Sequence, residues 1–364
     1  CFEEKNNDCR RQRMMKVLIV IMMAGMWCMQ PEKASAADPV IRVILTTTDF
    51  NSRYHQEITV SYDGKEITYT AEEVKKQGDK VRIPAQKDGI RILSIQRQSG
   101  TPVYDGSIEI IPKEEGLIIV NELFLEKYLT RVVPSEMPAT YEKEALKAQA
   151  VAAHTYAERQ HLLEQSHPTA ELCGADFSND SSQYQACFTE NQARQYYGDN
   201  FEASYAKITS AVDEVLPYVL EYDGTPIIAA FCSMSAGTTE SAETVWGSKV
   251  EYLVPVESEA DTSAPRYLET ASFTGEEFQA AVQDALPDAV WDTDMAKWVQ
   301  VGACSQSGTV LEVTVGGKTC SGQELRQMLG LRSAVFSVDV QDGKLVFTTK
   351  GYGHGVGMSQ YGAE

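Results

Sequence analysis

The segment Ala145-Leu-Lys-Ala-Gln-Ala-Val-Ala-Ala153 decides the fold of this chain. It lies inside a helical pattern that runs from about residue 141 to residue 163. Its small apolar side chains let neighbouring elements approach the helix closely on several sides. The sequence therefore predicts a buried central helix, with the other elements of the core packed around it.

Strand patterns and turn signals lie on both sides of this helix. The region before it contains short alternating segments such as Ile41-Arg-Val-Ile-Leu45 and carries no chemical motif. After it, hairpins are predicted around Asp223-Gly224 and around Asp342-Gly343. The strands of the first hairpin are apolar enough that we expect them in the core.

Two capping boxes, Thr274-Gly-Glu-Glu277 and Ser321-Gly-Gln-Glu324, predict helices in a further segment. The predicted fold class is α+β: a β-rich N-terminal region packed on a mixed helix and sheet core, with an inserted α/β subdomain. The predicted parts are residues 1–37 (upstream residues plus a signal peptide or membrane anchor), 38–120 (the β-rich region), 121–256 (first part of the core), 257–335 (the inserted subdomain) and 336–364 (second part of the core, expected to lack a C-terminal helix).

The composition limits the classes of partner. Of 364 residues, 43% are hydrophobic and 23% are charged, so the chain can bury a sizeable core. Asp and Glu number 52 against 32 Lys and Arg, a formal net charge of −20. Because binding to phosphates requires a basic surface, nucleic acid is not an expected partner.

Residues 1–37 have the pattern of an export signal. Basic residues precede an apolar run over residues 17–29, and the small residues Ala34-Ser-Ala-Ala37 follow. Translation is expected to begin at Met14 or Met15. The alternative to a cleaved signal is an N-terminal membrane anchor, and both interpretations place the rest of the chain outside the cytoplasm.

Glu136 is the best candidate for an acid or base. It lies between Pro134 and Pro138, which predict a bent loop rather than a helix, and it has apolar neighbours. An apolar surrounding disfavours the charged carboxylate and raises its pKa, so the group can donate a proton near neutral pH. The alternative is that Glu136 caps the following helix or stays solvated.

A second set of candidates involves a thiol and hydroxyl groups. Cys232 follows an apolar strand and could form a nucleophilic pair with His354, although a cysteine at a strand end is commonly just buried. Ser233, Ser235 and Gly237 could instead form a polar rim that binds sugar hydroxyls or a carboxylate.

Glycines at positions 351, 353, 355 and 357 surround His354. They either permit tight packing or let a ligand approach a single imidazole, which with Gln360 and Tyr361 would line a polar cleft. The spacing is not that of a dinucleotide-binding turn, and no organic cofactor is expected.

His167, Cys173 and Cys187 fall in a polar segment and could supply three ligands to a structural Zn²⁺. No Cys-x-x-Cys pair is present, and a Cys173–Cys187 disulfide is the alternative. A second disulfide, between Cys304 and Cys320, would flank a predicted strand.

Four blocks of this sequence together resemble the stage II sporulation protein D family. They are the sequences from Leu125 to Pro138, Ala148 to Ala157, Ser235 to Glu240 and Gly351 to Gly362, in the order of the family. The resemblance implies a membrane-associated lytic transglycosylase that cleaves peptidoglycan glycan strands during engulfment in endospore formers. It also implies two partners, the amidase stage II sporulation protein P and the membrane protein stage II sporulation protein M, and a location at the engulfing membrane, facing the intermembrane space.

The resemblance also assigns residues. Glu136 matches the catalytic glutamate, His154 stands where the family usually has an arginine, and His167 with Cys173 fits the zinc-binding members. Cys187 would complete that metal site from the string Tyr184-Gln-Ala-Cys187, which differs from the usual Cys-Gln-Ala-Tyr. The expected substrate-binding residues are His154, Ser233, Ser235, Gly237, Glu240, His354, Gln360 and Tyr361.

The expected reaction breaks the bond between N-acetylmuramic acid and N-acetylglucosamine in peptide-free strands and leaves 1,6-anhydro ends. Two other functions stay open from the sequence. One is a Cys232/His354 wall amidase, and the other is a non-catalytic peptidoglycan-binding scaffold of the engulfment complex.

Overall fold

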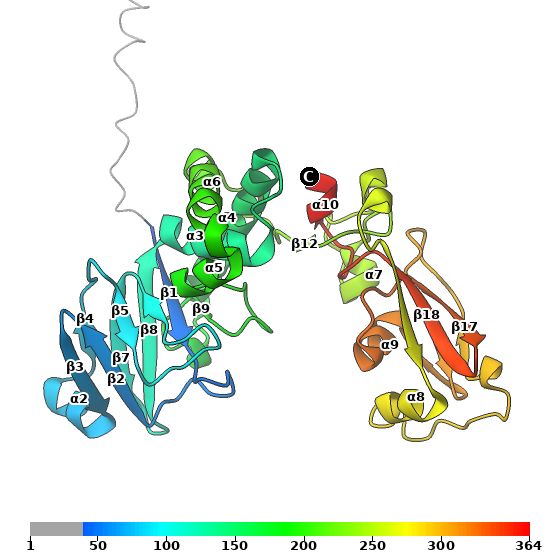
Figure 1. Cartoon of the computed structure of the whole chain (residues 1–364), viewed down its shortest axis with the longest axis horizontal. Coiled ribbons are helices and arrows are strands. Elements are labelled where there is room, and N and C mark those ends of the chain that lie inside the picture. The colour runs from blue at the N-terminus through cyan, green and yellow to red at the C-terminus, as the bar shows by residue number, and fades with distance from the viewer. Residues whose placement is uncertain (1–38) are drawn as a thin grey trace, which may run out of the picture. The chain divides into compact units, whose positions relative to one another are not determined.

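The computed structural model describes residues 39–364, which form a mixed assembly of helices and sheets (Figure 1). The α+β fold class is thus confirmed. The predicted signal or anchor lies outside the described residues. Within residues 39–364, no helix combines the length and the apolar character needed to cross a bilayer.

Two sheets make up the region before the central helix. A five-stranded sheet has the order β4-β7-β8-β1-β9, in which β1 pairs antiparallel with β8 and parallel with β9. A four-stranded sheet has the order β3-β2-β5-β6, and both sheets contribute isoleucines to one buried cluster. The strands are β1 (Val40–Leu45), β2 (Glu57–Tyr62), β3 (Lys65–Thr70), β4 (Val81–Ile83), β5 (Ile90–Ile92), β6 (Val103–Tyr104), β7 (Ser107–Pro112), β8 (Leu117–Phe124) and β9 (Phe177–Ser178), and helix α2 (Ala71–Gln77) follows β3.

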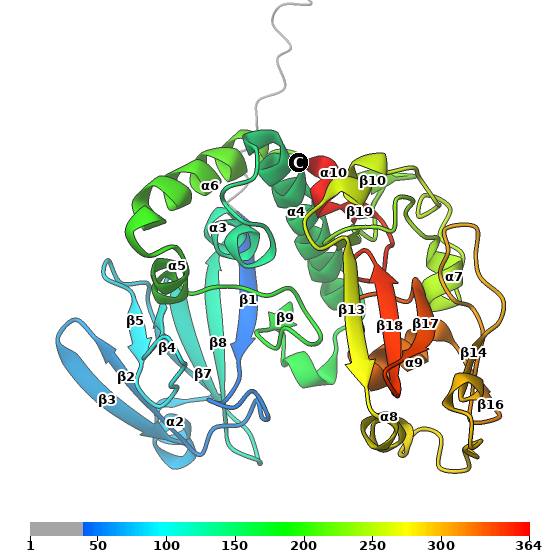
Figure 2. The ribbon, with the colours of Figure 1, turned by 45° about the vertical axis from the view of Figure 1, so that its right-hand side comes forward.

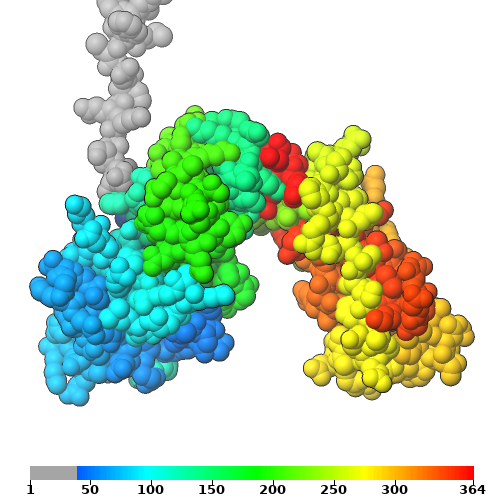
Figure 3. Space-filling view, viewed as in Figure 1, coloured from blue at the N-terminus to red at the C-terminus, as the bar shows by residue number. Residues whose placement is uncertain are grey.

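The predicted central helix is confirmed as α4 (Lys143–Ser166). Helix α4 packs against α3 (Leu125–Glu136) and α6 (Phe201–Val215) (Figure 2), and its alanines at 145, 150, 153 and 157 are buried. Helix α5 (Glu190–Tyr197) joins this group, and Asn191 donates a hydrogen bond to the carbonyl of Thr101 at 3.2 Å. The surface of α5 and α6 accordingly borders that of the N-terminal strands (Figure 3).

The hairpin predicted around Asp223-Gly224 forms, but it is not in the core. Strands β10 (Glu221–Tyr222) and β11 (Thr225–Pro226) are short, and Tyr222 is exposed. The apolar residues 227–230, which follow this hairpin, line a groove and do not extend the pairing of β10 and β11. Only β12 (Phe231–Cys232) continues as a strand, because its partner is the distant β19 (Met358–Ser359).

The segment after residue 257 has its own core. Both predicted capping boxes are confirmed, at Thr274 and Ser321. The last hairpin, β17–β18, belongs with this segment and not with the core around α4, since β18 pairs along its length with β13. Helix α7 (Ala242–Trp246) precedes this segment, and the elements after residue 257 are β13 (Leu268–Phe273), α8 (Gly275–Val282), β14 (Val299–Val301), β15 (Val313–Val315), β16 (Lys318–Cys320), α9 (Gly322–Leu329), β17 (Phe336–Gln341), β18 (Lys344–Lys350) and α10 (Gln360–Ala363).

Candidate active site

Glu136 is the last residue of α3, not part of a bent loop as predicted. Pro134 lies inside the helix, where the missing N–H costs one hydrogen bond, and the surrounding buried residues hold the turn in place. The helix ends at Met137, whose φ of −135° and ψ of 132° are extended. The next residue is Pro138, and a residue that precedes a proline avoids the helical region.

Glu136 is partly buried at the end of α3, and its pKa is shifted in the predicted direction. Burial raises the pKa of Glu136, and a hydrogen bond from the backbone N–H of Ala186 offsets part of this rise. Ser135 also holds Ala186 in place, because Oγ of Ser135 lies 2.7 Å from the carbonyl oxygens of both Ala186 and Val132 and donates to them. The segment around Ala186 is therefore held against the end of α3.

Residues 351–362, the terminal motif, reach the end of α3 through Gln360, which is only 7% exposed. Its Nε2 donates to the backbone carbonyl of Glu136 at 3.0 Å and to Oε1 of Gln149 on α4 at 3.1 Å. The next residue, Tyr361, places its ring edge against Tyr141 with 5.5 Å between centroids. Residues more than 200 positions apart in the sequence thus meet at the end of α3.

A buried carboxylate that the sequence did not reveal holds this motif. Asp261 is fully buried and accepts hydrogen bonds at Oδ2 from the N–H and the Oγ of Ser235, at 2.8 and 2.5 Å. Its Oδ1 accepts from Oγ of Ser359 at 2.7 Å. In the sequence, Asp261 lies in a polar stretch that resembles an exposed loop, and no motif marks it.

Four of the predicted substrate-binding residues make hydrogen bonds within the protein. The hydroxyl of Ser235 donates a hydrogen bond to Asp261, and its Oγ accepts another from the N–H of Gly237 at 3.1 Å. Glu240 is 4% exposed, and its Oε2 accepts from Oγ of Ser305 at 2.5 Å. The backbone carbonyl of the partly exposed Ser233 accepts a hydrogen bond from the N–H of Tyr361 at 3.1 Å.

The glycines of the terminal motif permit tight packing. A Cβ atom at Gly357 would lie 2.1 Å from the carbonyl oxygen of Ala230, and one at Gly353 would lie 2.9 Å from Cβ of Cys232. Both residues have positive φ, of 79° and 112°, which glycine adopts readily. Of the two alternatives, close backbone packing is what the geometry requires at these positions.

His354 and Cys232 are neighbours, but their chemistry does not favour a nucleophilic pair. The backbone N–H of Val356 donates to Nδ1 of His354 at 3.0 Å, so that nitrogen is an acceptor and the ring is neutral. Burial and the nearby Arg326 lower the pKa of His354. Burial raises the pKa of the Cys232 thiol to about 11, which disfavours the thiolate.

His154 lies on α4 away from the residues that meet at Glu136. It is five residues beyond Gln149, which turns its side chain by about 140° around the helix. It is 7% exposed and lies beside the backbone of Tyr218, and burial lowers its pKa. The structure therefore does not bring His154 together with Glu136.

The structure does not assemble the predicted zinc site. Cys187 packs with the cluster that contains Val43, whereas Cys173 packs with the cluster that contains Ile44. Successive residues of a strand point to opposite faces, so β1 separates the two thiols. His167 is exposed, and its Nδ1 contacts Oγ of Ser166 at 3.0 Å.

Burial raises the pKa of Cys187 to about 11, so the free thiol is protonated at neutral pH. Among residues 39–364, no three His, Cys, Asp or Glu side chains converge as metal ligands. The described cysteines are all free thiols, which also contradicts the Cys173–Cys187 and Cys304–Cys320 disulfides. The described residues thus do not bring three ligands to one point in this structure, and the zinc site stays a prediction.

Glu136 lies in a part of the chain that is similar to known proteins. A family model described as Stage II sporulation protein matches residues 113–222. Stage II sporulation protein D of Bacillus amyloliquefaciens is 38% identical over 246 residues, which cover 67% of this chain and 68% of that protein. The protein of the same name from Bacillus subtilis (strain 168) is 38% identical over 244 residues, with 67% and 68% covered. The amidase enhancer of Bacillus subtilis (strain 168) is 28% identical over 287 residues, which cover 65% of this chain and 37% of that protein.

Proposed function

Because the chain belongs to the stage II sporulation protein D family, we propose that it is a lytic transglycosylase acting on peptidoglycan glycan strands during engulfment. The observation that carries the proposal is the carboxyl of Glu136, whose pKa is raised by burial at a helix end. A carboxyl that keeps its proton at higher pH than usual can serve as a general acid.

The reaction needs only one carboxyl group. Protonated Glu136 donates its proton to the glycosidic oxygen between N-acetylmuramic acid and N-acetylglucosamine, and that bond breaks as the oxygen leaves. The resulting carboxylate then takes the proton of the muramic 6-hydroxyl as this oxygen closes on C1. The ring closure replaces an attacking water, so a second carboxylate to activate water is not required.

The neighbours of Glu136 support this assignment by fixing its position. Gln360 holds the backbone carbonyl of Glu136, and Ser135 holds the Ala186 segment whose N–H reaches the carboxyl. Acid–base catalysis depends on such placement, because a shift of the donor by about 1 Å can cost about 100-fold in rate. Asp261 contributes indirectly by holding Ser359, the residue before Gln360.

As part of the same proposal, we divide the predicted substrate-binding residues into two groups. Ser233, His354 and Tyr361, which are partly exposed, would contact the sugar directly. The buried residues Ser235, Glu240, Gln360 and His154, and the partly exposed Gly237, would act by holding the surrounding backbone.

The cellular setting is likewise a proposal that family membership supports. We place the protein outside the cytoplasm at the engulfing membrane, attached through its N-terminal segment, together with stage II sporulation proteins P and M. The similarity to a protein named amidase enhancer is in keeping with an amidase as a partner.

The decisive experiment incubates the chain with peptide-free glycan strands and analyses the products by mass spectrometry. We expect fragments that end in a 1,6-anhydro ring and are lighter by one water molecule than the products of hydrolysis. Ordinary reducing ends would show hydrolysis and contradict the proposal. Binding without any cleavage would favour a scaffold.

The activity should fall as the pH rises. Burial favours the protonated form of Glu136, so its pKa lies above that of a free glutamate. The acid step uses this protonated form, and kcat/KM should decline as the pH increases through the raised pKa. A profile of kcat/KM against pH checks this, and a rate that is flat or increases across this range would contradict the role of Glu136 as the acid.

Replacing Cys232 by alanine should leave cleavage of glycan strands within about two-fold of the parent. The thiol is 5% exposed and has a pKa of about 11, so the nucleophilic thiolate is rare at neutral pH. Product release from peptide-free strands measures the effect. Loss of activity in a folded Cys232→Ala protein, or on alkylation of this thiol, would instead favour the Cys232/His354 amidase.

A further inference from the structure

A small pocket of about 160 Å³ lies on the face of β1 that carries Val43, and the mechanism above does not use it. The buried side chains of Val43, Leu45 and Leu123 form its apolar wall. A protein cavity of about 150 Å³ holds one benzene molecule, so this pocket has room for about six heavy atoms. A sugar ring with its substituents is larger. The occupant is therefore a small molecule or the end of a longer one.

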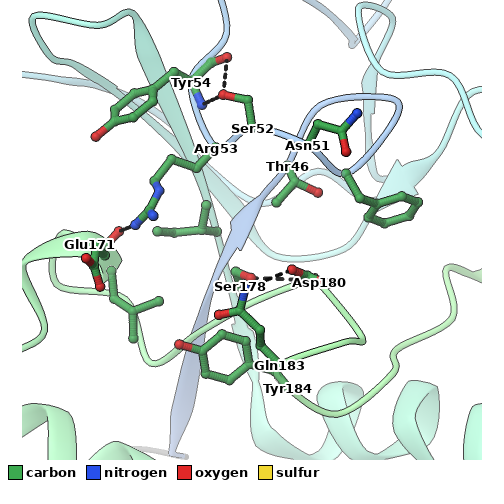
Figure 4. Close-up of a pocket in the computed structure, with 13 residues that line it drawn as sticks. Thr46, Asn51, Ser52, Arg53, Tyr54, Glu171, Ser178, Asp180, Gln183 and Tyr184 are labelled. Atoms are coloured by element: carbon green, nitrogen blue, oxygen red, sulfur yellow. Dashed lines mark hydrogen bonds between the residues drawn. The ribbon is translucent and has the colours of Figure 1, made fainter. Parts of the chain in front are cut away.

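Two arginines, Arg97 and Arg131, line this pocket, and none of its lining residues in the described part of the chain is an aspartate or a glutamate. A larger pocket of about 300 Å³ on the opposite face of β1 differs in this respect (Figure 4). There the carboxylates of Glu171 and Asp180 accompany a single cation, Arg53. The local charge thus favours an anion in the smaller pocket and not in the larger one.

Arg131 is the more deeply buried of the two cations, with an exposure of 3%. Its Nη2 donates to Oδ2 of Asp105 at 2.5 Å, and the side chain of Asp105 is itself 42% exposed. Nε of Arg131 is buried and has no hydrogen-bond partner among residues 39–364. A buried donor without an acceptor destabilises the protein, and a ligand that supplies an acceptor relieves this cost.

Arg97 is partly buried, and its charge is only weakly compensated. Its Nη1 and Nη2 donate to the carbonyls of Thr46, Thr47 and Thr48 at 2.6–3.0 Å, and these carbonyls carry no net charge. The carboxylate of Asp49 acts on Arg97 from an exposed position, where water and salt screen it. Burial lowers the pKa of Arg97, as expected for a cation that has lost water without gaining a buried carboxylate.

Two further groups in the pocket are neutral donors. Burial raises the pKa of Tyr104 to about 12, so its hydroxyl keeps its proton at neutral pH. The thiol of Cys187, whose pKa is about 11, is protonated for the same reason. Neither group adds negative charge, and both suit a ligand that accepts hydrogen bonds.

The pocket borders the segment that contacts the candidate acid. Ala186 lines the pocket, and its N–H donates to the carboxyl of Glu136. Phe188 also lines the pocket, and its N–H donates to the carbonyl of Arg131 at 3.0 Å. A ligand in the pocket therefore contacts the same short segment that contacts Glu136.

We propose that this pocket is a binding site for a small carboxylate anion, whose charged end faces the two arginines and whose alkyl end packs on the apolar wall. Hydrogen bonds from a guanidinium to a carboxylate are charge-assisted and stronger than those between neutral groups. A phosphate fits less well, because some of its charged oxygens would face the apolar wall. A free short-chain acid and the terminal carboxylate of a peptide share the required chemistry. The inference concerns binding alone and does not depend on the proposed function.

Titration of the full chain, followed by NMR of the ligand, tests the site with propionate and its neutral amide, propionamide. The two probes have the same size and shape, so a difference between them reports the charge. Propionate should bind at least about ten-fold more tightly than propionamide. Equal affinity overturns the proposal, as does the absence of propionate binding, which would show a pocket that holds only water. This comparison uses the unaltered protein, so it does not depend on whether a variant folds.

Variants then assign the binding to the pocket. Arg131→Gln and Arg97→Gln should each weaken propionate binding about ten-fold and reduce its preference over the amide. Arg97→Gln covers the case in which loss of the buried Arg131 impairs folding. Arg53→Gln, at the larger pocket, is the matched control and should change neither affinity. A preference that survives in both pocket variants, or that is lost in Arg53→Gln, overturns the proposal.

A third probe, N-acetyl-D-alanine, distinguishes the two sources of the carboxylate. It carries the same acid group next to a peptide bond. If it binds more tightly than propionate, the terminal carboxylate of a peptide is the ligand, and if it binds more weakly, a free short-chain acid is. Both results support the anion site, provided that Arg131→Gln or Arg97→Gln weakens the binding.

Discussion

Replacement of Glu136 by glutamine should reduce cleavage of peptide-free glycan strands by at least about 100-fold. Glutamine keeps the size of the side chain and its acceptor oxygen for the N–H of Ala186, but it cannot give a proton to the leaving oxygen. Release of 1,6-anhydro products over time measures the loss. The matched control is Glu126→Gln, which alters a glutamate in the first turn of the same helix and should keep parental activity.

The same variant should be at least as stable as the parent at neutral pH. Burial raises the folded-state pKa of Glu136 above its unfolded value, so the ionised carboxylate weakens the folded state once the pH exceeds the unfolded pKa. Glutamine removes this penalty. Thermal unfolding of the two proteins checks the sign. A stable but inactive Glu136→Gln protein supports the acid role, and an active one would favour the scaffold.

Replacement of Asp261 by alanine should destabilise the fold by about 3 kcal/mol. The change leaves the N–H and hydroxyl of Ser235 and the hydroxyl of Ser359 without their acceptor in a buried position. Chemical unfolding measures the difference in free energy of unfolding. Asp284→Ala, at an exposed position on the segment after α8, is the control and should lie within about 0.5 kcal/mol of the parent.

Asp261 should also affect activity, through Gln360. Loss of its bond to Ser359 frees the segment that carries Gln360 to the carbonyl of Glu136. Asp261→Asn, which retains one acceptor oxygen, should therefore stay folded and lose part of the cleavage rate. Its pH profile should match that of the parent, because Glu136 itself is unchanged. A folded Asp261→Asn protein with full activity would show that this anchor does not position the site.

Local sequence determined much of the secondary structure. The central helix α4, the helices at Thr274 and Ser321 and the turn at Asp342-Gly343 were all predicted, because the signals lie within a few residues of each other. The rise in the pKa of Glu136 was also predicted, from its apolar neighbours in the sequence. The helical conformation of Glu136 was not, because buried packing overcomes the effect of Pro134.

The tertiary structure alone decided which distant groups meet. The amide of Gln360 reaches α3, the carboxylate of Asp261 binds two serines from separate segments, and β18 pairs with β13. It also separated Cys173 from Cys187, which the sequence placed only fourteen positions apart, because they lie on opposite faces of β1. The chemistry of each side chain is a property of the sequence, whereas its partners depend on long-range packing that no local pattern encodes.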